Sequence, residues 1–182
     1  MSPADEAGYI YIFWLTPESE VSKPDDETAS SLLDDDDLYV PRSQRTAQAL
    51  QRYSSVRGPQ HRGLAQGQRT ITLKIGRAAN VHRRMSQWTK QCGQNITLIR
   101  YYPYTKTAES SGTEASLARK VPHVHRVERL VHLELAEKRV VKSDCAECGR
   151  EHREWFEVEA SKAGLRAVDE AVRRWVAWAE RQ

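Results

Sequence analysis

A Lys-Ile-Gly tripeptide at residues 74–76 stands where a strand-forming run gives way to a helix-forming run that carries Arg84. The glycine permits a tight exit from the strand, and the free N–H groups at the start of the helix favour an anion. The guanidinium of Arg84 can hold two phosphate oxygens and stabilise negative charge that grows there during a reaction. Tyr9 or Tyr11, on an earlier strand, could lie against the same place. These residue types indicate a site for a phosphate group.

A carboxylate from the helix expected after Pro122 could complete such a site by bringing a hard divalent cation. Mg²⁺ prefers one or two carboxylates together with waters and phosphate oxygens, so a single carboxylate is a sufficient protein ligand for Mg²⁺ or Mn²⁺ once a phosphate is bound. Taken singly, Glu128 and Arg84 are also compatible with solvated charges on helix surfaces. Tyr9 and Tyr11 are likewise compatible with strand aromatics that only pack.

A second group of chemically able residues is Cys145, Cys148 and His152, in the pattern Cys-x2-Cys-x3-His. Three such ligands at this spacing indicate Zn²⁺, which takes four ligands in a tetrahedron. We therefore expect residues 143–153 to form a zinc knuckle, with Gly149 allowing the sharp turn after Cys148. A closed site of four ligands would be structural. The alternative is a polar loop with two free thiols.

The fourth zinc ligand is expected on the helix that leads into this knuckle. His132 is the candidate, and His125 is the alternative. Because His125, Glu128 and His132 share one helix face, a single metal centre that uses all three is a further alternative, although it would leave the cysteines unused. Cys92 is expected to be an ordinary residue at a helix end.

The surrounding sequence predicts an α/β domain in which helices flank a small mixed, mainly antiparallel sheet. Asn80 is the expected N-cap of the helix that follows Gly76, and Pro122 is expected to open the helix that carries Glu128. The expected strands are residues 8–15, 70–76, 96–104 and 154–158, and the expected helices are residues 80–91, 122–140 and an amphipathic helix within 161–182.

Residues 16–69 differ in character from the rest of the chain and form a long insertion between the first two expected strands. An acidic stretch with four consecutive Asp residues is followed by a stretch rich in Arg, Gln, Ser and Gly that contains no acid. The absence of a long apolar stripe predicts a disordered or mobile surface loop, with at most a weak helix over residues 43–53. Its two halves could pair with each other, or the basic half could lie along phosphates.

The length of 182 residues suits one domain, expected over residues 7–160, with the last helix packed on it. No apolar run approaches the roughly 20 residues that cross a bilayer, and the acidic N-terminus lacks the layout of a secretory signal. Together with only three cysteines, these features predict an intracellular protein without a membrane partner.

Charge is divided unevenly along the chain. Residues 1–40 hold one Lys against eleven Asp or Glu, whereas residues 41–182 hold 27 Lys or Arg against 14 acids. A strongly basic folded part is typical of proteins that bind nucleic acid, although excess charge can also serve solubility alone.

Four stretches in order resemble a known family: "GYIYIF", "LKIGRAANVHRRM", "RVERLVHLEL" and "EWFEV". The first two are similar to the paired strands of the GIY-YIG nuclease superfamily. Together the stretches most resemble its phage-derived DNA-binding branch, found in fungal proteins described as meiotically up-regulated. The resemblance covers about residues 7–15 and 70–160, and leaves the insertion and the last helix outside it.

This resemblance implies hydrolysis of a DNA phosphodiester bond with one divalent cation held by a glutamate. By position in the motifs, Glu128 matches that glutamate, Arg84 matches the arginine that stabilises the phosphate, and Tyr11, or else Tyr9, matches the tyrosine that activates water. Lys74 occupies the place of the second-motif tyrosine. A DNA partner in turn implies a nuclear location.

Two departures leave a second interpretation open. Lys74 is a poor base at its ordinary pKa, and Trp88 stands where nuclease members often have a histidine. Together with Arg77 and Arg83, these residues could form a DNA-binding face without turnover, although Trp88 could also simply pack. A third interpretation is a surface for a protein partner, formed by the knuckle and by Trp175 and Trp178 of the last helix.

Overall fold

The structure is a computed structural model, and it describes residues 6–17, 20–34, 40–56, 67–104, 119–142, 145 and 147–182. The four-Asp run of the insertion, most of its basic half after residue 56, and residues 105–118 lie largely outside the described residues. In chain order the elements are β1 (Tyr9–Leu15), α1 (Asp26–Ser31), α2 (Val40–Arg52), β2 (Ser55–Val56), β3 (Arg69–Ala78), α3 (Val81–Cys92), β4 (Ile96–Tyr102), α4 (Val124–Glu134), the 3-10 helix η4 (Ala136–Lys138), β5 (Arg139–Lys142), β6 (His152–Glu159) and α5 (Lys162–Glu180).

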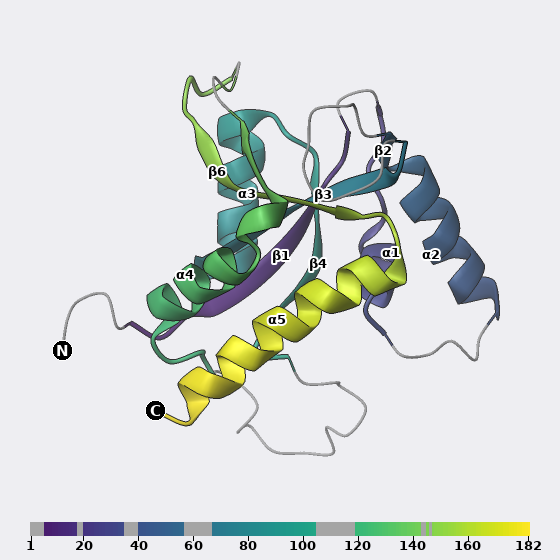
Figure 1. The fold of residues 1–182 in the computed structure, drawn as a ribbon. Coiled ribbons are helices and arrows are strands. Elements are labelled where there is room, and N and C mark those ends of the chain that lie inside the picture. The colour runs from purple at the N-terminus through teal and green to yellow at the C-terminus, as the bar shows by residue number, and fades with distance from the viewer. Residues whose placement is uncertain are drawn as a thin grey trace.

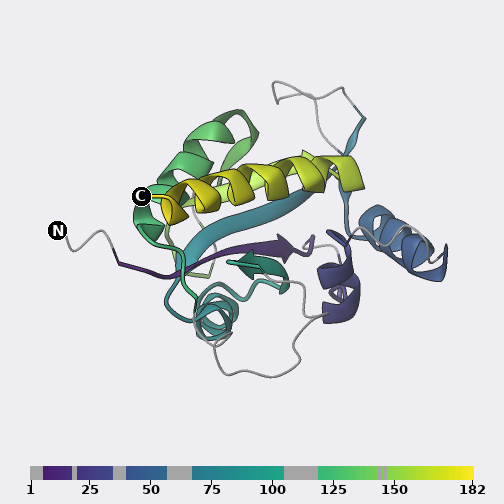
Figure 2. The same cartoon turned by 90° about the horizontal axis from the view of Figure 1, so that it is seen from below.

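The strands form one open sheet in the order β4-β1-β3-β6-β5, and β2 pairs with the start of β3. Every pairing between these strands is antiparallel. Helices α4 and α5 lie on one side of the sheet and α3 lies on the other, as Figures 1 and 2 show. The predicted fold class, a mainly antiparallel sheet flanked by helices, is confirmed.

Strand β1 is apolar along its whole length because both of its faces are covered. Ile10, Ile12 and Trp14 belong to the large apolar cluster shared with α4 and α5. Tyr11 and Phe13 point to the opposite face and belong to a smaller cluster beneath α3. Because successive side chains of a strand point to opposite faces, one set of β1 side chains lies in the core and the other lies at the candidate site.

The insertion contains more regular structure than the sequence predicted. Helix α2 forms over the stretch where a weak helix was expected, and the six-residue α1, which was not expected, packs beside β4. Ala29 is buried within α1, and Leu32 and Leu33 just beyond it are buried too, so this short helix contributes to the large apolar cluster. Burial of these few residues against the sheet provides the stability that the local sequence lacks.

Expected boundaries also differ: helix α4 begins at Val124 rather than at Pro122, and two further boundaries depend on strand pairing. Strand β3 does not stop at Gly76 but continues to Ala78, because β1 pairs with it as far as Tyr9 opposite Ala78. Helix α4 ends at Glu134 rather than near residue 140, and residues 139–142 form β5, an outer strand paired with β6. Strand pairing decided both boundaries, and local sequence cannot report it.

Helix α5 is the amphipathic helix predicted for the C-terminal segment, with Ser161 as its N-cap. Its Leu165, Val168 and Val172 face the large cluster. Within the part of the chain that the structure describes, no helix combines the length and apolar character needed to cross a membrane.

Candidate active site and metal centre

The inner strand β3 has an open rim where β6 leaves it. Strand β6 pairs with β3 only as far as Lys74 opposite Trp155. Beyond that point two side chains of α4 reach the rim: Nε2 of His132 lies 2.9 Å from the carbonyl oxygen of Ile75, and Oε1 of Glu128 accepts a hydrogen bond from the N–H of Arg77 at 3.1 Å. Helix α4 thus supplies the hydrogen bonds that a neighbouring strand would otherwise make.

Glu128 is held beside this rim by a second interaction. Its Oε2 lies 2.9 Å from Nε of Arg77, and the Glu128 side chain is 17% exposed. Burial raises the pKa of Glu128 despite the opposing charge of Arg77. A partly buried carboxylate suits a hard divalent cation. In this structure the positive charge beside Glu128 is the guanidinium of Arg77.

Tyr11 lies directly across Gly76 of the neighbouring strand. A Cβ atom at Gly76 would lie 2.5 Å from the Tyr11 hydroxyl oxygen, so only glycine leaves room for this tyrosine. Burial, and next the charge of Glu154, raise the pKa of Tyr11 to about 12, while Arg84 acts in the opposite direction through a hydrogen bond and its charge. The phenol is therefore protonated at neutral pH.

Tyr9, the alternative tyrosine, lies elsewhere. Its ring meets the edge of Tyr101 with the ring centroids 5.7 Å apart. Tyr9 pairs with Ala78 at the far end of the β1–β3 ladder, two residues beyond the pair of Tyr11 and Gly76. Of the two candidates, Tyr11 is the one beside Gly76.

Lys74 is fully buried and forms an ion pair with Glu154 of β6, whose side chain is 39% exposed. The Lys74 ammonium also lies 3.7 Å from the centre of the Trp88 ring. Burial lowers the pKa of Lys74, whereas for Glu154 the charge and hydrogen bond of Lys74 outweigh burial and lower the pKa. Both pKa values are lowered for understandable reasons: Lys74 is enclosed, so burial disfavours its charge, whereas Glu154 is partly exposed, so the attraction of Lys74 prevails.

Helix α3 contributes three of the predicted site residues. Arg84 is half-buried and lies near Tyr11, while Arg83 is exposed at the start of the helix. Asn80 caps the helix as predicted, because its side chain accepts a hydrogen bond from the N–H of Arg83. Trp88 is half-buried over Lys74 and does not present a free ring for stacking on a base.

The structure thus brings together Tyr11, Lys74, Arg84 and Glu128, and it adds Glu154. The charges of Arg84, Glu128 and Glu154 all act on the Tyr11 hydroxyl. Sequence reasoning did not select Glu154, since an acid in an alternating strand reads as a solvent-facing charge. The signal available was the lysine in the otherwise apolar run of β3, which requires a buried counter-charge.

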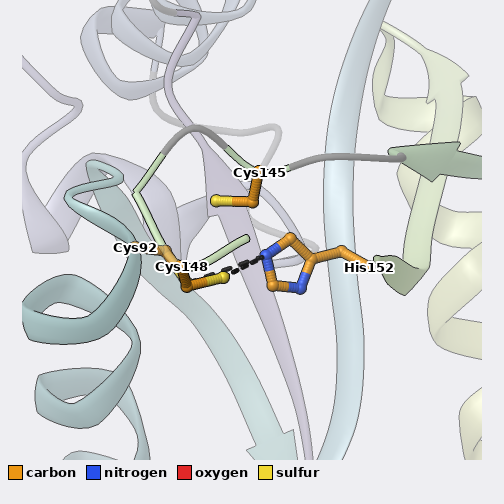
Figure 3. Close-up of side chains that lie close together, drawn as sticks. All are labelled: Cys92, Cys145, Cys148 and His152. Atoms are coloured by element: carbon orange, nitrogen blue, oxygen red, sulfur yellow. Dashed lines mark hydrogen bonds between the residues drawn. The ribbon is translucent and has the colours of Figure 1, made fainter. Parts of the chain in front are cut away.

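The second centre is a cluster of four potential metal ligands, Cys92, Cys145, Cys148 and His152, shown in Figure 3. Their ligand atoms all lie within 4.8 Å of one another. Sγ of Cys148 lies 3.7 Å from Sγ of Cys92 and 3.3 Å from Nε2 of His152, and Sγ of Cys92 lies 3.7 Å from the same nitrogen. All three cysteines are free of disulfide bonds.

These separations fit a tetrahedral zinc site. With Zn–S near 2.3 Å and Zn–N near 2.0 to 2.1 Å, neighbouring sulfurs should lie about 3.8 Å apart and sulfur and nitrogen about 3.6 Å apart. Gly149 has φ of 62°, so the predicted turn after Cys148 uses its left-handed conformation. Hydrogen bonds from the N–H groups of Cys148 and Glu147 lower the pKa of Cys145, whereas burial and the neighbouring Cys148 raise the pKa of Cys92 to about 12.

The predicted fourth ligand requires correction. Neither His132 nor His125 belongs to the cluster, and Cys92 at the end of α3 takes the place assigned to them. His132 instead contacts the β3 backbone, and its ring centroid lies 5.0 Å from that of Phe156. The alternative of a single metal centre formed by His125, Glu128 and His132 also does not fit, because Glu128 and His132 contact the backbone of β3. The site could hold a metal such as zinc.

Comparison with known protein families identifies a relationship. A family model described as Meiotically up-regulated gene 113 matches residues 70–178, which is more than half of the chain. The match begins at β3 and therefore includes both carboxylates, Arg84 and all four residues of the Cys3His cluster. No curated protein and no solved structure matches the chain significantly.

Proposed function

The chain belongs to the family described as Meiotically up-regulated gene 113, and we propose that its site beside Gly76 binds DNA and hydrolyses a phosphodiester bond with the help of Mg²⁺ or Mn²⁺. The observation that carries this proposal is the convergence of a guanidinium and two carboxylates on the Tyr11 hydroxyl, which lies against Gly76 of β3. We propose further that the fold is of the GIY-YIG type, because β1 places Tyr11 against the glycine of the second motif.

Each residue has a role that its surroundings support. Arg84 is half-buried on α3 and binds a phosphate oxygen, stabilising the charge that develops during attack by water. Tyr11 keeps its proton at neutral pH, so it orients the attacking water by hydrogen bonding rather than acting as an anion. Glu128 would hold the cation, which supplies Lewis-acid stabilisation of the phosphate when bound. A DNA substrate accords with the nuclear location expected from the sequence.

Arg77 and Arg83 have different parts in this proposal. Arg83 is exposed at the start of α3, where it is free to contact the DNA backbone. Arg77 is paired with Glu128 and would move towards a DNA phosphate when a cation takes its place. Trp88, which covers Lys74, is assigned no contact with bases.

The test is incubation of the protein with supercoiled plasmid and Mg²⁺ or Mn²⁺. We expect nicking by the wild type and a loss of at least about 100-fold with Arg84→Ala or Glu128→Ala, the size typical of a lost charge-stabilising group. Arg181→Ala and Glu137→Ala are matched controls, because both residues are exposed outside the site, and they should nick normally. Equal nicking by wild type and both site variants would refute the proposal.

Binding without cleavage is the second candidate function. The observation that favours it is the complete burial of Lys74, which keeps this residue away from a phosphate and leaves the second-motif position without a direct catalytic group. It predicts no nicking, a gel shift at low salt that survives Glu128→Ala, and an affinity that falls steeply as salt rises. A protein partner at the last helix is a weaker candidate, since Trp175 and Trp178 are half-buried and the indole N–H of Trp175 donates to Glu134.

We also propose that the Cys3His cluster holds a structural Zn²⁺. The match between the observed separations and a tetrahedron supports zinc, and four protein ligands leave no open position for substrate. Elemental analysis of the purified protein should find one zinc per chain and less than about a fifth of that in Cys92→Ser. The His125→Ala and His132→Gln variants should keep the metal. Zinc loss in either histidine variant but not in Cys92→Ser would refute this ligand set.

A further inference from the structure

The candidate active site and the Cys3His cluster are built on the same two elements. Helix α3 contributes Arg84 to the first and Cys92 to the second, and β6 contributes Glu154 to the first and His152 to the second. Any movement of α3 relative to the start of β6 therefore changes the geometry of both centres at once.

Trp88 lies between the two centres and contacts both. On the side of the metal cluster, the Trp88 ring centroid is 5.0 Å from that of His152. On the side of the candidate active site, the Lys74 ammonium lies 3.7 Å from the centre of the same ring. Arg84, Trp88 and Cys92 are spaced at i, i+4 and i+8, so one face of α3 carries all three. Two indoles therefore contact both His152 and Lys74: Trp88, which is the one on α3, and Trp155 of β6, whose ring centroid lies 6.3 Å from that of His152.

Lys74 depends on that indole. Its ammonium is completely buried, and among the described residues its counter-charge is Glu154, with the ring faces of Trp88 and, at 5.3 Å, Trp155 beside it. A desolvated cation gains more from an aromatic face than an exposed cation does. Glu154, being partly exposed, is in turn held in place by Lys74.

Helix α3 packs on the small apolar cluster of the sheet through Val81 and the partly buried Met85 and Trp88. Among its residues, all of which the structure describes, only Val81 at the first position and Cys92 at the last are buried. The C-terminal half is thus attached by the buried Cys92 and by the partly buried Trp88. A metal bound by Cys92 and His152 would cross-link that end of α3 to β6 and hold Trp88 against Lys74.

We infer that Trp88 is a positioning residue: it holds the Lys74–Glu154 pair in the active site, and it does so only while the metal-bound Cys3His cluster keeps α3 docked on β6. This inference rests on the zinc site proposed above and not on DNA cleavage. By this inference the Cys3His cluster also controls the position of the Glu154 carboxylate in the active site.

Acylation of lysine amines, followed by mass spectrometry, tests the inference directly. Lys74 is buried in the wild type, so its labelling should be slow, while Lys90, exposed on the same helix, gives an internal reference. We expect labelling of Lys74 relative to Lys90 to rise at least 10-fold in Trp88→Leu with zinc content unchanged. Trp88→Phe keeps an aromatic face and should stay within 3-fold of the wild type. Trp178→Leu on α5 is the matched control and should not change Lys74 labelling.

The role of the metal is tested by adding a chelator to the same proteins. Removal of zinc from the wild type should reproduce the rise seen in Trp88→Leu, and removal from Trp88→Leu should add less than 2-fold, because the two changes break the same chain of contacts. A full second rise in the chelated variant would overturn the inference, as would slow labelling of Lys74 in Trp88→Leu. Absence of bound metal in the wild type would overturn it too, whereas a failure to nick DNA would leave it standing.

Discussion

The two faces of the sheet are held together by different chemistry. On the face covered by α4 and α5, Ile12, Phe156 and Val172 belong to a broad cluster of buried apolar side chains. On the face covered by α3, the apolar cluster is small, and beside it lie the buried Lys74 ammonium with its Glu154 carboxylate and four metal-binding side chains. The first face is stabilised mainly by burial of apolar area, with a buried charged group in which Arg100 pairs with Asp169 of α5. The other relies more on charges and thiols, which also carry the proposed chemistry. The face that could act on a substrate is the one with little apolar stability to spare.

We expect the largest loss of stability from a substitution in the large apolar cluster, on the face covered by α4 and α5. Phe156→Ala removes a ring that is fully buried in the large cluster, so we expect a loss of about 3 to 5 kcal/mol in the free energy of unfolding. Urea denaturation measures it. Leu133→Ala, at a side chain that is 60% exposed, should cost less than about 0.5 kcal/mol. Equal losses would contradict the assignment of stability to this face.

On the α3 face, the Lys74–Glu154 pair should respond asymmetrically. Glu154→Gln leaves the fully buried ammonium without its counter-charge, and we expect a loss of about 3 kcal/mol at pH 7, at the low end for a broken buried pair. Lys74→Met leaves a carboxylate that solvent reaches, and should change stability by less than about 1.5 kcal/mol. The two variants are compared by urea denaturation, and the reverse order would show that Lys74 is not buried as described.

Alkaline pH should weaken the same face through Tyr11. Its pKa is raised to about 12 in the folded protein, against about 10 when unfolded, so between these values the folded state binds more protons and stability falls as pH rises. The full difference corresponds to about 2.7 kcal/mol, present below pH 10 and lost by about pH 12. Wild type and Tyr11→Phe, unfolded with urea from pH 9 to 12, should diverge by this amount. Parallel curves would mean that the phenol is not enclosed.

The smallest effect concerns how the helices of the two faces begin. Asn80 caps α3 and Ser161 caps α5, each accepting a hydrogen bond from the backbone. Replacing either cap by alanine should cost about 1 kcal/mol. In Asn80→Ala we expect that loss to appear as faster amide exchange confined to the start of α3, by about 5-fold. In Ser161→Ala it should appear in global unfolding, because α5 has many buried residues. Local fraying of both helices would remove this distinction.

Local pattern was sufficient for most of the fold. The continuous apolar run of β1, the alternation in β3 and the amphipathic spacing of α5 each report burial within a few residues, so these elements could be predicted. The short α1 and the outer strand β5 could not be, because their order comes from packing against the sheet rather than from their own composition.

The same distinction holds for the candidate site. Arg84 and Glu128 could be located from spacing, and Cys145, Cys148 and His152 from a short motif. Cys92 could not, because it lies 56 residues before Cys148 and nothing in the intervening sequence indicates that the two sulfurs meet. Glu154 was missed for a similar reason: its partner Lys74 is 80 residues away, and only the register between β3 and β6 brings them together.

The side chains of α4 along β3 also bear on aggregation. An uncovered rim of an inner strand is a template on which another chain can add, and here His132 and Glu128 occupy that rim at Ile75 and Arg77. Glu128→Gln keeps an acceptor for the Arg77 N–H, whereas Glu128→Ala exposes it. The carboxylate that would hold the cation therefore also covers a backbone N–H of β3 that could otherwise pair with a strand of a second molecule.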